Sequence, residues 1–367
     1  MESRRLYFID LVRAFAILMM LQGHFIDTLL LNTYKDKSYL AFEVWSYFRG
    51  ITAPTFFTIS GLIFTFLLLR ARDKNEDRKR IKKGVIRGLM LIGVGYLLRF
   101  PIFDWLNGHF NTNVLKVDVL HIIGLSLIGI IILYLLSLKH LRLFSITTLL
   151  LGCVIFVTDP LYRGMELENV PVFFSNYLSK AHGSIFTFLP WFGYMCFGAY
   201  LASVFYRFLE KPKFKPVIII VFFLLGYVLI EWSSFLLMKL HHLTGIQLFY
   251  DSANFNYLFT RLGNVLIYFG IFYGLENFLK LPLFLKIGQK TLSIYVIHFI
   301  IMYGSFTGYG LNTIIGRTLT PWMAIGGAIL FLVVVCVISF NYAKTNAYIY
   351  EKLRAVFYYV KEKRKND

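Results

Sequence analysis

Two ionisable residues stand out in the first long apolar stretch of the chain, YFIDLVRAFAILMMLQGHFIDTLL, which begins at Tyr7. Arg13 and His24 are eleven residues apart, so in a helix they point to one side, about 16 Å apart along the axis. An imidazole titrates near neutral pH and can act as a base or as a nucleophile that carries an acyl group. Asp27, one turn after His24, is placed to fix its tautomer, as an aspartate does in serine hydrolases. Acyl transfer is one reaction that needs such a base or nucleophile, and His24 and Asp27 are the predicted catalytic pair.

Other apolar stretches carry polar residues that we expect at the depth of His24. They are Arg49 in WSYFRGITAPTFFTISG, Asp118 and His121 in VDVLHIIG, and Arg261 at the start of a later stretch. Charged groups inside a membrane normally face the bundle interior or a watery cavity. We therefore predict these four residues to bind the substrate. The donor for a tetrahedral oxyanion is left open among Ser60, Arg49 and His121.

Two of the histidines have a second interpretation that is at least as good. His298, in SIYVIHFI, is predicted to lie in the inner half of its helix, away from His24. A histidine within a membrane is often an interhelix hydrogen-bond partner, and this applies to His298 and His121. The three cysteines, Cys153, Cys196 and Cys336, all fall in apolar stretches, so we expect neither disulfides nor a metal site.

The composition indicates which elements position these residues. Of 367 residues, 57% are hydrophobic and 16% are charged, and the mean hydropathy is +0.64. Soluble domains contain about 25% charged residues, so the chain is typical of an integral membrane protein. The net charge of +18 lies between apolar runs and forms no continuous basic face, which argues against a nucleic-acid partner.

A transmembrane helix needs about 20 apolar residues. Such stretches predict an all-α bundle of about ten transmembrane helices, beginning near Phe8, Glu43, Gly84, Asp118, Leu141, Ser184, Pro216, Leu258, Thr291 and Pro321. No linker divides the chain, so residues 1–343 are predicted to form one integral membrane domain. Residues 344–367 are predicted to form a basic cytoplasmic tail. We expect no cleaved signal peptide, because Asp10 and Arg13 interrupt the first apolar run.

The distribution of Lys and Arg predicts the orientation. If the N-terminus is cytoplasmic and the helices alternate, Lys and Arg in the inner segments outnumber those in the outer segments by more than three to one. This positive-inside pattern predicts cytoplasmic termini and a multi-pass protein of the inner (cytoplasmic) membrane. The sequence is compatible with a homo-oligomer.

The opening RRLYFIDLVRAFAILMMLQGHF resembles the first helix of the transmembrane acyltransferase superfamily, whose members carry an arginine and a histidine at this spacing. The stretches RGITAPTFFTISG, VDVLHIIGLSLI, PWFGYMCFGAYLA and GQKTLSIYVIHF resemble the heparan-α-glucosaminide N-acetyltransferase catalytic-domain family. The five stretches extend from residue 4 to residue 299. The resemblance implies an acetyltransferase that uses acetyl-CoA, with His24 as the catalytic histidine and Arg13 on the acyl-CoA side.

If acetyl-CoA is the donor, the basic residues near the inner face have a second predicted role, which is to bind it. CoA is polyanionic and cytoplasmic, so we predict that it binds Arg13, Arg80, Lys83 and Arg87, with Arg70, Lys79 and Lys82 nearby. The same basic run would equally serve as an orientation signal alone.

The acceptor implied by the resemblance is an amino sugar or a glycan hydroxyl on the outer side. The predicted outer loops are short, so we expect an acceptor that is small or presented on a lipid. A secondary transporter for a small polar or anionic solute is the main alternative. A transporter would favour internal repeats, and the Arg13/His24 element has no second copy in residues 180–367.

Overall fold

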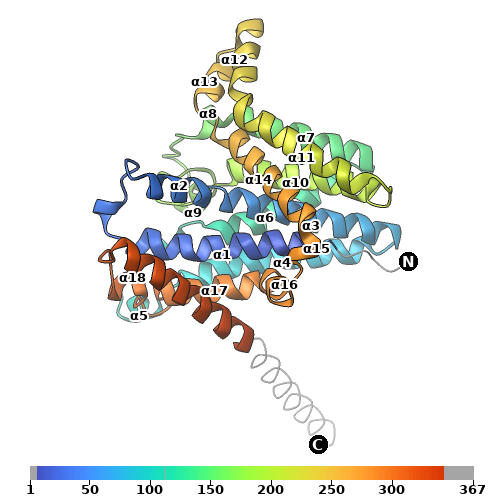
Figure 1. The fold of residues 1–367 in the computed structure, drawn as a ribbon. Helices are drawn as coiled ribbons and strands as arrows, with labels where there is room; N and C mark the ends of the chain where they lie inside the picture. The colour runs from blue at the N-terminus through green and yellow to red at the C-terminus, as the bar shows by residue number, and fades with distance from the viewer. Residues whose placement is uncertain (1–5, 111, 343–367) are drawn as a thin grey trace, which may run out of the picture.

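The computed structural model describes residues 6–110 and 112–342 of the chain. Within these ranges every regular element is a helix, and the only β-type pairing is an isolated bridge between Leu30 and Leu319 (Figure 1). The predicted all-α class is therefore confirmed for the described residues. The tail predicted at 344–367 lies outside them.

The described helices follow one another with short connections. Their bounds are α1 (Tyr7–Leu29), η1 (Asn32–Tyr34), α2 (Leu40–Arg49), α3 (Thr52–Asp73), α4 (Asp77–Leu98), α5 (Ile102–Leu106), η2 (Thr112–Leu115), α6 (Val119–Leu136), α7 (Leu141–Val157), α8 (Asp159–Tyr162), α9 (Val172–Leu178), α10 (Phe188–Phe208), α11 (Phe214–Glu231), α12 (Ser233–Thr244), α13 (Gln247–Asn254), α14 (Tyr257–Gly274), α15 (Glu276–Leu279), α16 (Pro282–Gln289), α17 (Thr291–Tyr303) and α18 (Leu311–Ile314). A further helix spans Pro321–Tyr342.

Six segments of the described chain are long and apolar enough to cross a membrane: Tyr7–Leu29, Leu40–Asp73, Thr112–Leu136, Phe188–Phe208, Phe214–Glu231 and Pro321–Tyr342. The bent pair α16–α17 makes a seventh if it is counted as one span. The protein is thus a polytopic helical membrane protein, but this criterion does not reach the predicted ten. The first half of α4 is strongly basic, and α7 has only 17 residues.

The centre of the bundle is built on a close crossing of α3 and α10, beside which α1 and α6 pack (Figure 1). At Gly198 in α10, an added Cβ atom would lie 2.0 Å from the carbonyl oxygen of Thr58 in α3. Only a residue without a side chain permits this approach of the two backbones. The crossing fixes α3, which lines both of the cavities described below.

Helices α1 and α17 run side by side in the same direction. Near the start of both helices, Arg13 Nη2 donates a hydrogen bond to Thr291 Oγ1 at 2.7 Å. Near their ends, the hydroxyl of Tyr303 lies 3.1 Å from His24 Nδ1. Helix α16 is bent by 72° from α17 and crosses the first half of α1. The bend lets α17 follow α1 from Arg13 to His24.

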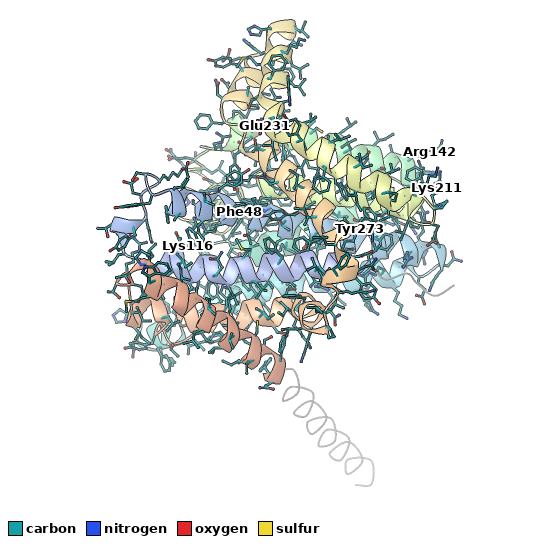
Figure 2. The ribbon with its side chains drawn as sticks, viewed as in Figure 1. Phe48, Lys116, Arg142, Lys211, Glu231 and Tyr273 are labelled. Atoms are coloured by element: carbon teal, nitrogen blue, oxygen red, sulfur yellow. The ribbon has the colours of Figure 1, made fainter. Side chains whose placement is uncertain are left out.

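Three of the segments predicted to be cytoplasmic, around Asp77, Lys139 and Lys211, meet at one end of the bundle, which we call the basic end. There Lys139 Nζ lies 2.5 Å from Asp77 Oδ2, which joins the α6–α7 connection to the start of α4. Arg72 at the end of α3 donates to Tyr206 in α10 at 3.2 Å. Figure 2 shows Arg142 and Lys211 at this end and Lys116 at the opposite end. Predicted inner and outer segments are therefore separated in space, as the orientation prediction requires.

Candidate active site

His24 lines a cavity of about 930 Å³ at the end of the bundle opposite the basic end. This volume lies within the range of about 300–1,000 Å³ that is common for small-molecule sites. We call it the His24 cavity. Its walls come from α1, α2, α3, α4, α6, α10, α14, α17, α18 and the connections near them. The charged side chains that line it are Asp27, Arg49, Arg99, Lys116, Asp118 and Lys180.

The imidazole of His24 is held through one of its two nitrogens. His24 Nδ1 lies 3.1 Å from the hydroxyl of Tyr303 and 3.4 Å from Nε2 of His298. His298 is fully buried, and its ring meets that of His24 edge to face at 5.2 Å between centroids. Since both contacts are made to Nδ1, Nε2 is the nitrogen left for chemistry in the cavity.

The predicted partner of His24 has a different contact in the structure. Asp27 Oδ1 pairs with Arg49 Nη1 at 2.7 Å, and the Asp27 carbonyl accepts a hydrogen bond from Lys35 Nζ. Both Asp27 and Arg49 line the His24 cavity. The groups in contact with His24 Nδ1 are instead Tyr303 and His298, at the position where the sequence analysis expected Asp27.

His298 and Tyr303 were not assigned to the site from the sequence. His298 was expected in the inner half of its helix, but α17 places it within hydrogen-bonding distance of His24. Tyr303 is the last residue of α17, and Gly304 ends the helix in a left-handed conformation with φ of 65°. A left-handed residue after a helix is usually glycine. The sequence Tyr303-Gly304 was therefore a signal for the end of the helix, although not for the contact with His24.

The predicted substrate residues Asp118 and His121 form a buried cluster at the start of α6. Asp118 caps the helix by accepting a hydrogen bond from the backbone N–H of Leu120 at 3.0 Å. Arg99 Nε lies 3.3 Å from Asp118 Oδ2, and His121 Nδ1 lies 2.9 Å from Oδ1. Asp118 lines the cavity, whereas His121 is fully buried behind it. His121 therefore supports Asp118 and does not line the cavity wall.

Arg261, the fourth predicted substrate residue, also lies outside the lining. Its guanidinium sits over the rings of Tyr47 and Tyr257, at 4.5 and 5.2 Å from their centroids. It donates to the carbonyl of Tyr47 at 2.9 Å. Tyr257 lines the His24 cavity, so Arg261 stands one side chain away from it.

Three polar groups of the cavity wall were not singled out from the sequence. Thr52 Oγ1, Trp191 Nε1 and Ser305 Oγ are buried, line the cavity and have no hydrogen-bond partner in the described part of the chain. Buried polar groups normally have partners, so these three atoms are candidates to bind a polar ligand. Ser60, one of the expected oxyanion donors, lines a different cavity, nearer the basic end.

That second cavity, of about 270 Å³, brings together the four residues that were predicted to bind acetyl-CoA. Arg13, Arg80, Lys83 and Arg87 all line it, and its lining contains no carboxylate. Arg80 Nε is buried without a hydrogen-bond partner among the described residues. We call it the cationic cavity. Four cations without a lining acid suit a polyanionic ligand.

The two cavities lie along the same helices. Arg13 lines the cationic cavity, and Met20 is the first residue of α1 that lines the His24 cavity. Met20 is seven positions after Arg13, which is about 10 Å along the axis of α1. Helices α3, α4 and α6 also contribute to both walls. A ligand with an anionic head at Arg80 could thus extend along α1 towards His24.

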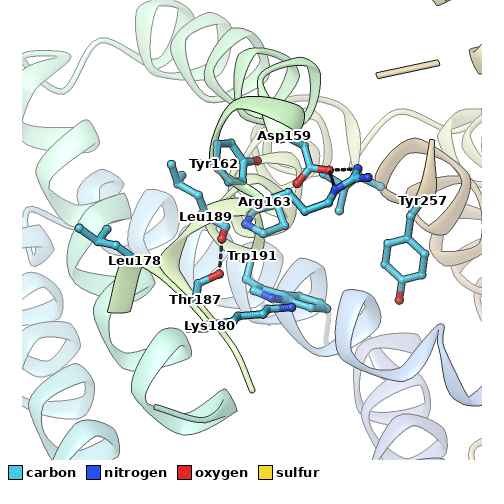
Figure 3. A pocket seen from close by; sticks show the side chains of 11 residues that line it. Asp159, Tyr162, Arg163, Leu178, Lys180, Thr187, Leu189, Trp191 and Tyr257 are labelled. Carbon is cyan, nitrogen blue, oxygen red and sulfur yellow. Dashed lines mark hydrogen bonds and ion pairs between the residues drawn. The ribbon is translucent and has the colours of Figure 1, made fainter. Parts of the chain in front are cut away.

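A smaller cavity of about 190 Å³ adjoins the His24 cavity (Figure 3). Both are lined by Lys180, Trp191 and Tyr257. In the smaller one, Asp159 Oδ2 accepts a hydrogen bond from Arg163 Nε at 2.8 Å. Because Asp159 and Arg163 pair with each other, the smaller cavity offers less free charge than the His24 cavity.

The comparison with protein families gives one match. The family model described as heparan-alpha-glucosaminide N-acetyltransferase, catalytic, matches residues 5–228. This stretch contains His24, Asp27, Arg49 and Asp118 and every residue of the cationic cavity, whereas His298 and Tyr303 lie beyond it. No curated protein matches the chain.

Proposed function

Because the chain belongs to the heparan-alpha-glucosaminide N-acetyltransferase catalytic-domain family, we propose that it transfers an acetyl group from acetyl-CoA to the amine or hydroxyl of a sugar. The donor enters at the basic end and the acceptor at the opposite end. The membrane is the inner membrane, and the basic end faces the cytoplasm. The observation that carries this proposal is that α1 lines two cavities, one at His24 and the other at Arg13, where the charged side chains are all cationic.

His24 Nε2 is the base in this mechanism. It takes the proton from the acceptor amine or hydroxyl as the acceptor nitrogen or oxygen attacks the thioester carbonyl. The tetrahedral intermediate then collapses, the carbon–sulfur bond breaks, and the leaving CoA sulfur takes the proton from His24 Nε2, which restores the base. Tyr303 and His298 hold Nδ1 and so keep the base pointing at the acceptor. The unpartnered Thr52 Oγ1, Trp191 Nε1 and Ser305 Oγ supply donors for the oxyanion or for the sugar.

The cationic cavity holds the phosphates of the donor in this proposal. Its volume is below that of a typical ligand pocket, so the rest of CoA must extend outside it. The acetyl group has to reach His24, about 16 Å from Arg13 along α1. A pantetheine arm is long and thin enough to follow the helices that line both cavities.

Acetyl-CoA turnover in proteoliposomes tests the proposal, with released CoA thiol as the readout and a mixture of amino sugars as acceptors. We expect thiol release by the wild type and its loss in His24→Ala. The matched control is His242→Ala, because His242 is exposed on α12. Equal, acceptor-independent rates in wild type and His24→Ala would falsify the assignment of His24. Acetylation of His24 by the donor alone would indicate a covalent acetyl-histidine intermediate instead of direct transfer.

The same assay tests the donor site. Arg80→Gln removes one charged hydrogen-bond donor from the cationic cavity and should raise the KM for acetyl-CoA about tenfold. Arg78→Gln is the control, since Arg78 is exposed on the same helix and does not line the cavity. If both variants keep the wild-type KM, the donor binds elsewhere.

A further inference from the structure

An apolar groove of about 550 Å³ runs between α1, α2 and α14, on the outside of the bundle. Its lining is Phe15, Met19, Gln22, Trp45, Phe48, Tyr268, Ile271 and Phe272. Figure 2 shows Phe48 on α2, above α1. Phe48 and Ile271 are exposed, at 43% and 37%. The groove is separate from the two cavities of the proposed active site.

In a membrane this groove must be filled by hydrocarbon. Helix α1 is a membrane span, and nearly every side chain of the groove is aromatic or aliphatic. Water does not fill an apolar space that offers it few hydrogen bonds. A single lipid chain can lie in the groove and pack against its rings.

One end of the groove is polar and lies next to the His24 cavity. Gln22 Oε1 accepts a hydrogen bond from Trp45 Nε1 at 2.7 Å. The guanidinium of Arg49 lies over the ring of Trp45, 5.2 Å from its centroid. Trp45 lines the groove and Arg49 lines the His24 cavity, so the two spaces are neighbours across this contact.

A cation stands at the same polar end. Arg261 lies seven residues before Tyr268 on α14, two turns away on the same face, about 10 Å along the axis. An added Cβ at Gly50, which lines the His24 cavity, would lie 2.8 Å from Arg261 Nη2. Within the described part of the chain, Arg261 donates hydrogen bonds to the neutral oxygens of Tyr47 and Asn264. Its positive charge is therefore available to an anionic ligand.

We propose that the acceptor is a sugar linked through phosphate to a lipid chain. The lipid chain lies in the groove, the phosphate pairs with Arg261, and the sugar enters the His24 cavity beside Arg49. Charge complementarity at Arg261 and the adjacency of the two spaces across Trp45 and Arg49 support this occupant. The inference rests on the proposed function and names the acceptor class for the same site.

Three synthetic acceptors test the inference in proteoliposomes: glucosaminyl phosphofarnesol, glucosamine 1-phosphate, and a farnesyl glucosaminide without phosphate. We expect kcat/KM for the phosphofarnesol acceptor to exceed that of each of the other two at least tenfold. Arg261→Gln should remove the advantage given by the phosphate. Ile271→Trp fills the groove and should remove the advantage given by the chain. Leu224→Trp, on an exposed position of α11, is the control for added bulk.

A second measurement does not depend on turnover. Farnesyl phosphate that carries a diazirine on its chain should crosslink to α1 or α14 in the wild type, and Ile271→Trp should reduce the yield.

Equal crosslinking by a diazirine phosphatidylcholine would show that the groove binds bulk lipid and would overturn the inference. Transfer to glucosamine 1-phosphate with no preference for the phosphofarnesol acceptor overturns it while leaving the proposed function intact. Transfer to none of the acceptors, despite specific crosslinking, counts against the proposed function instead.

Discussion

At the scale of single residues, the state of His24 depends on which neighbour holds Nδ1. If Nδ1 donates its proton to the Tyr303 oxygen or to His298 Nε2, then Nε2 is unprotonated and can act as a base. A carboxylate normally plays this part in serine hydrolases. In this chain Asp27, one turn after His24, is paired with Arg49. Tyr303 and His298 contact the imidazole in its place.

Tyr303→Phe removes one of these two contacts while keeping the ring. We expect kcat for acetyl transfer to fall about tenfold, in the lower part of the range for general acid–base effects, because His298 still holds Nδ1. The KM for acetyl-CoA should not change, since Tyr303 is remote from the cationic cavity. The measurement is steady-state kinetics with a pH profile. Tyr309→Phe, on an exposed residue of the same turn region, should behave as the wild type. An unchanged kcat in Tyr303→Phe would remove the tyrosine from the mechanism.

At the scale of helices, the site depends on two features of the backbone. The close crossing of α3 and α10 at Gly198 fixes the wall shared by both cavities. The bend between α16 and α17 lets α17 follow α1, so that Thr291 meets Arg13 and His298 meets His24. These helices connect the His24 cavity at one end of the bundle to the cationic cavity nearer the other.

Gly198→Ala tests the crossing. The added Cβ would lie 2.0 Å from a backbone oxygen, which cannot move as a side chain can. We expect a loss of stability on the order of 1–3 kcal/mol, seen as a lower Tm in detergent. The control is Gly326→Ala, where a Cβ has no heavy atom within 4 Å. There the better helix propensity of alanine should leave the free energy of unfolding unchanged or raise it by up to about 1 kcal/mol. The Tm of this control should therefore not fall. Equal Tm values would show that α3 and α10 separate readily.

At the scale of the whole molecule, the charges divide the bundle into two ends. The basic end carries Asp77, Lys139 and the neighbouring cations, and the His24 cavity lies at the opposite end. A donor from one compartment and an acceptor from the other can then meet within one bundle. The orientation of this arrangement in the membrane is a prediction from the positive-inside pattern.

Cysteine labelling in intact cells tests the orientation. In a background without the three native cysteines, Ser38→Cys should react with a membrane-impermeant maleimide, because Ser38 is exposed in a predicted outer segment. Lys74→Cys, exposed between α3 and α4 at the basic end, should react only after the membrane is permeabilised. The reverse pattern would place the His24 cavity on the cytoplasmic side and reverse the proposed entry of donor and acceptor.

The sequence by itself determined the features that depend on local geometry and composition. High hydropathy and few charges indicated an all-helical membrane protein, because a chain in lipid must satisfy its backbone hydrogen bonds within helices. The spacing of Arg13 and His24 on α1 and of Arg80, Lys83 and Arg87 on α4 follows from 3.6 residues per turn. Arg80, Lys83 and Arg87 therefore face one cavity from a single helix, although their role remains a prediction.

Tertiary structure alone decided which side chains from different helices meet. Asp27 pairs with Arg49 and not with His24, and His298 reaches His24, because the bend before α17 sets its register against α1. His121 is buried behind Asp118 for the same kind of reason. The packing angle and axial shift of two helices depend on every side chain between them. No periodicity within one helix encodes these quantities, so the neighbours of His24 could not be predicted from its own stretch.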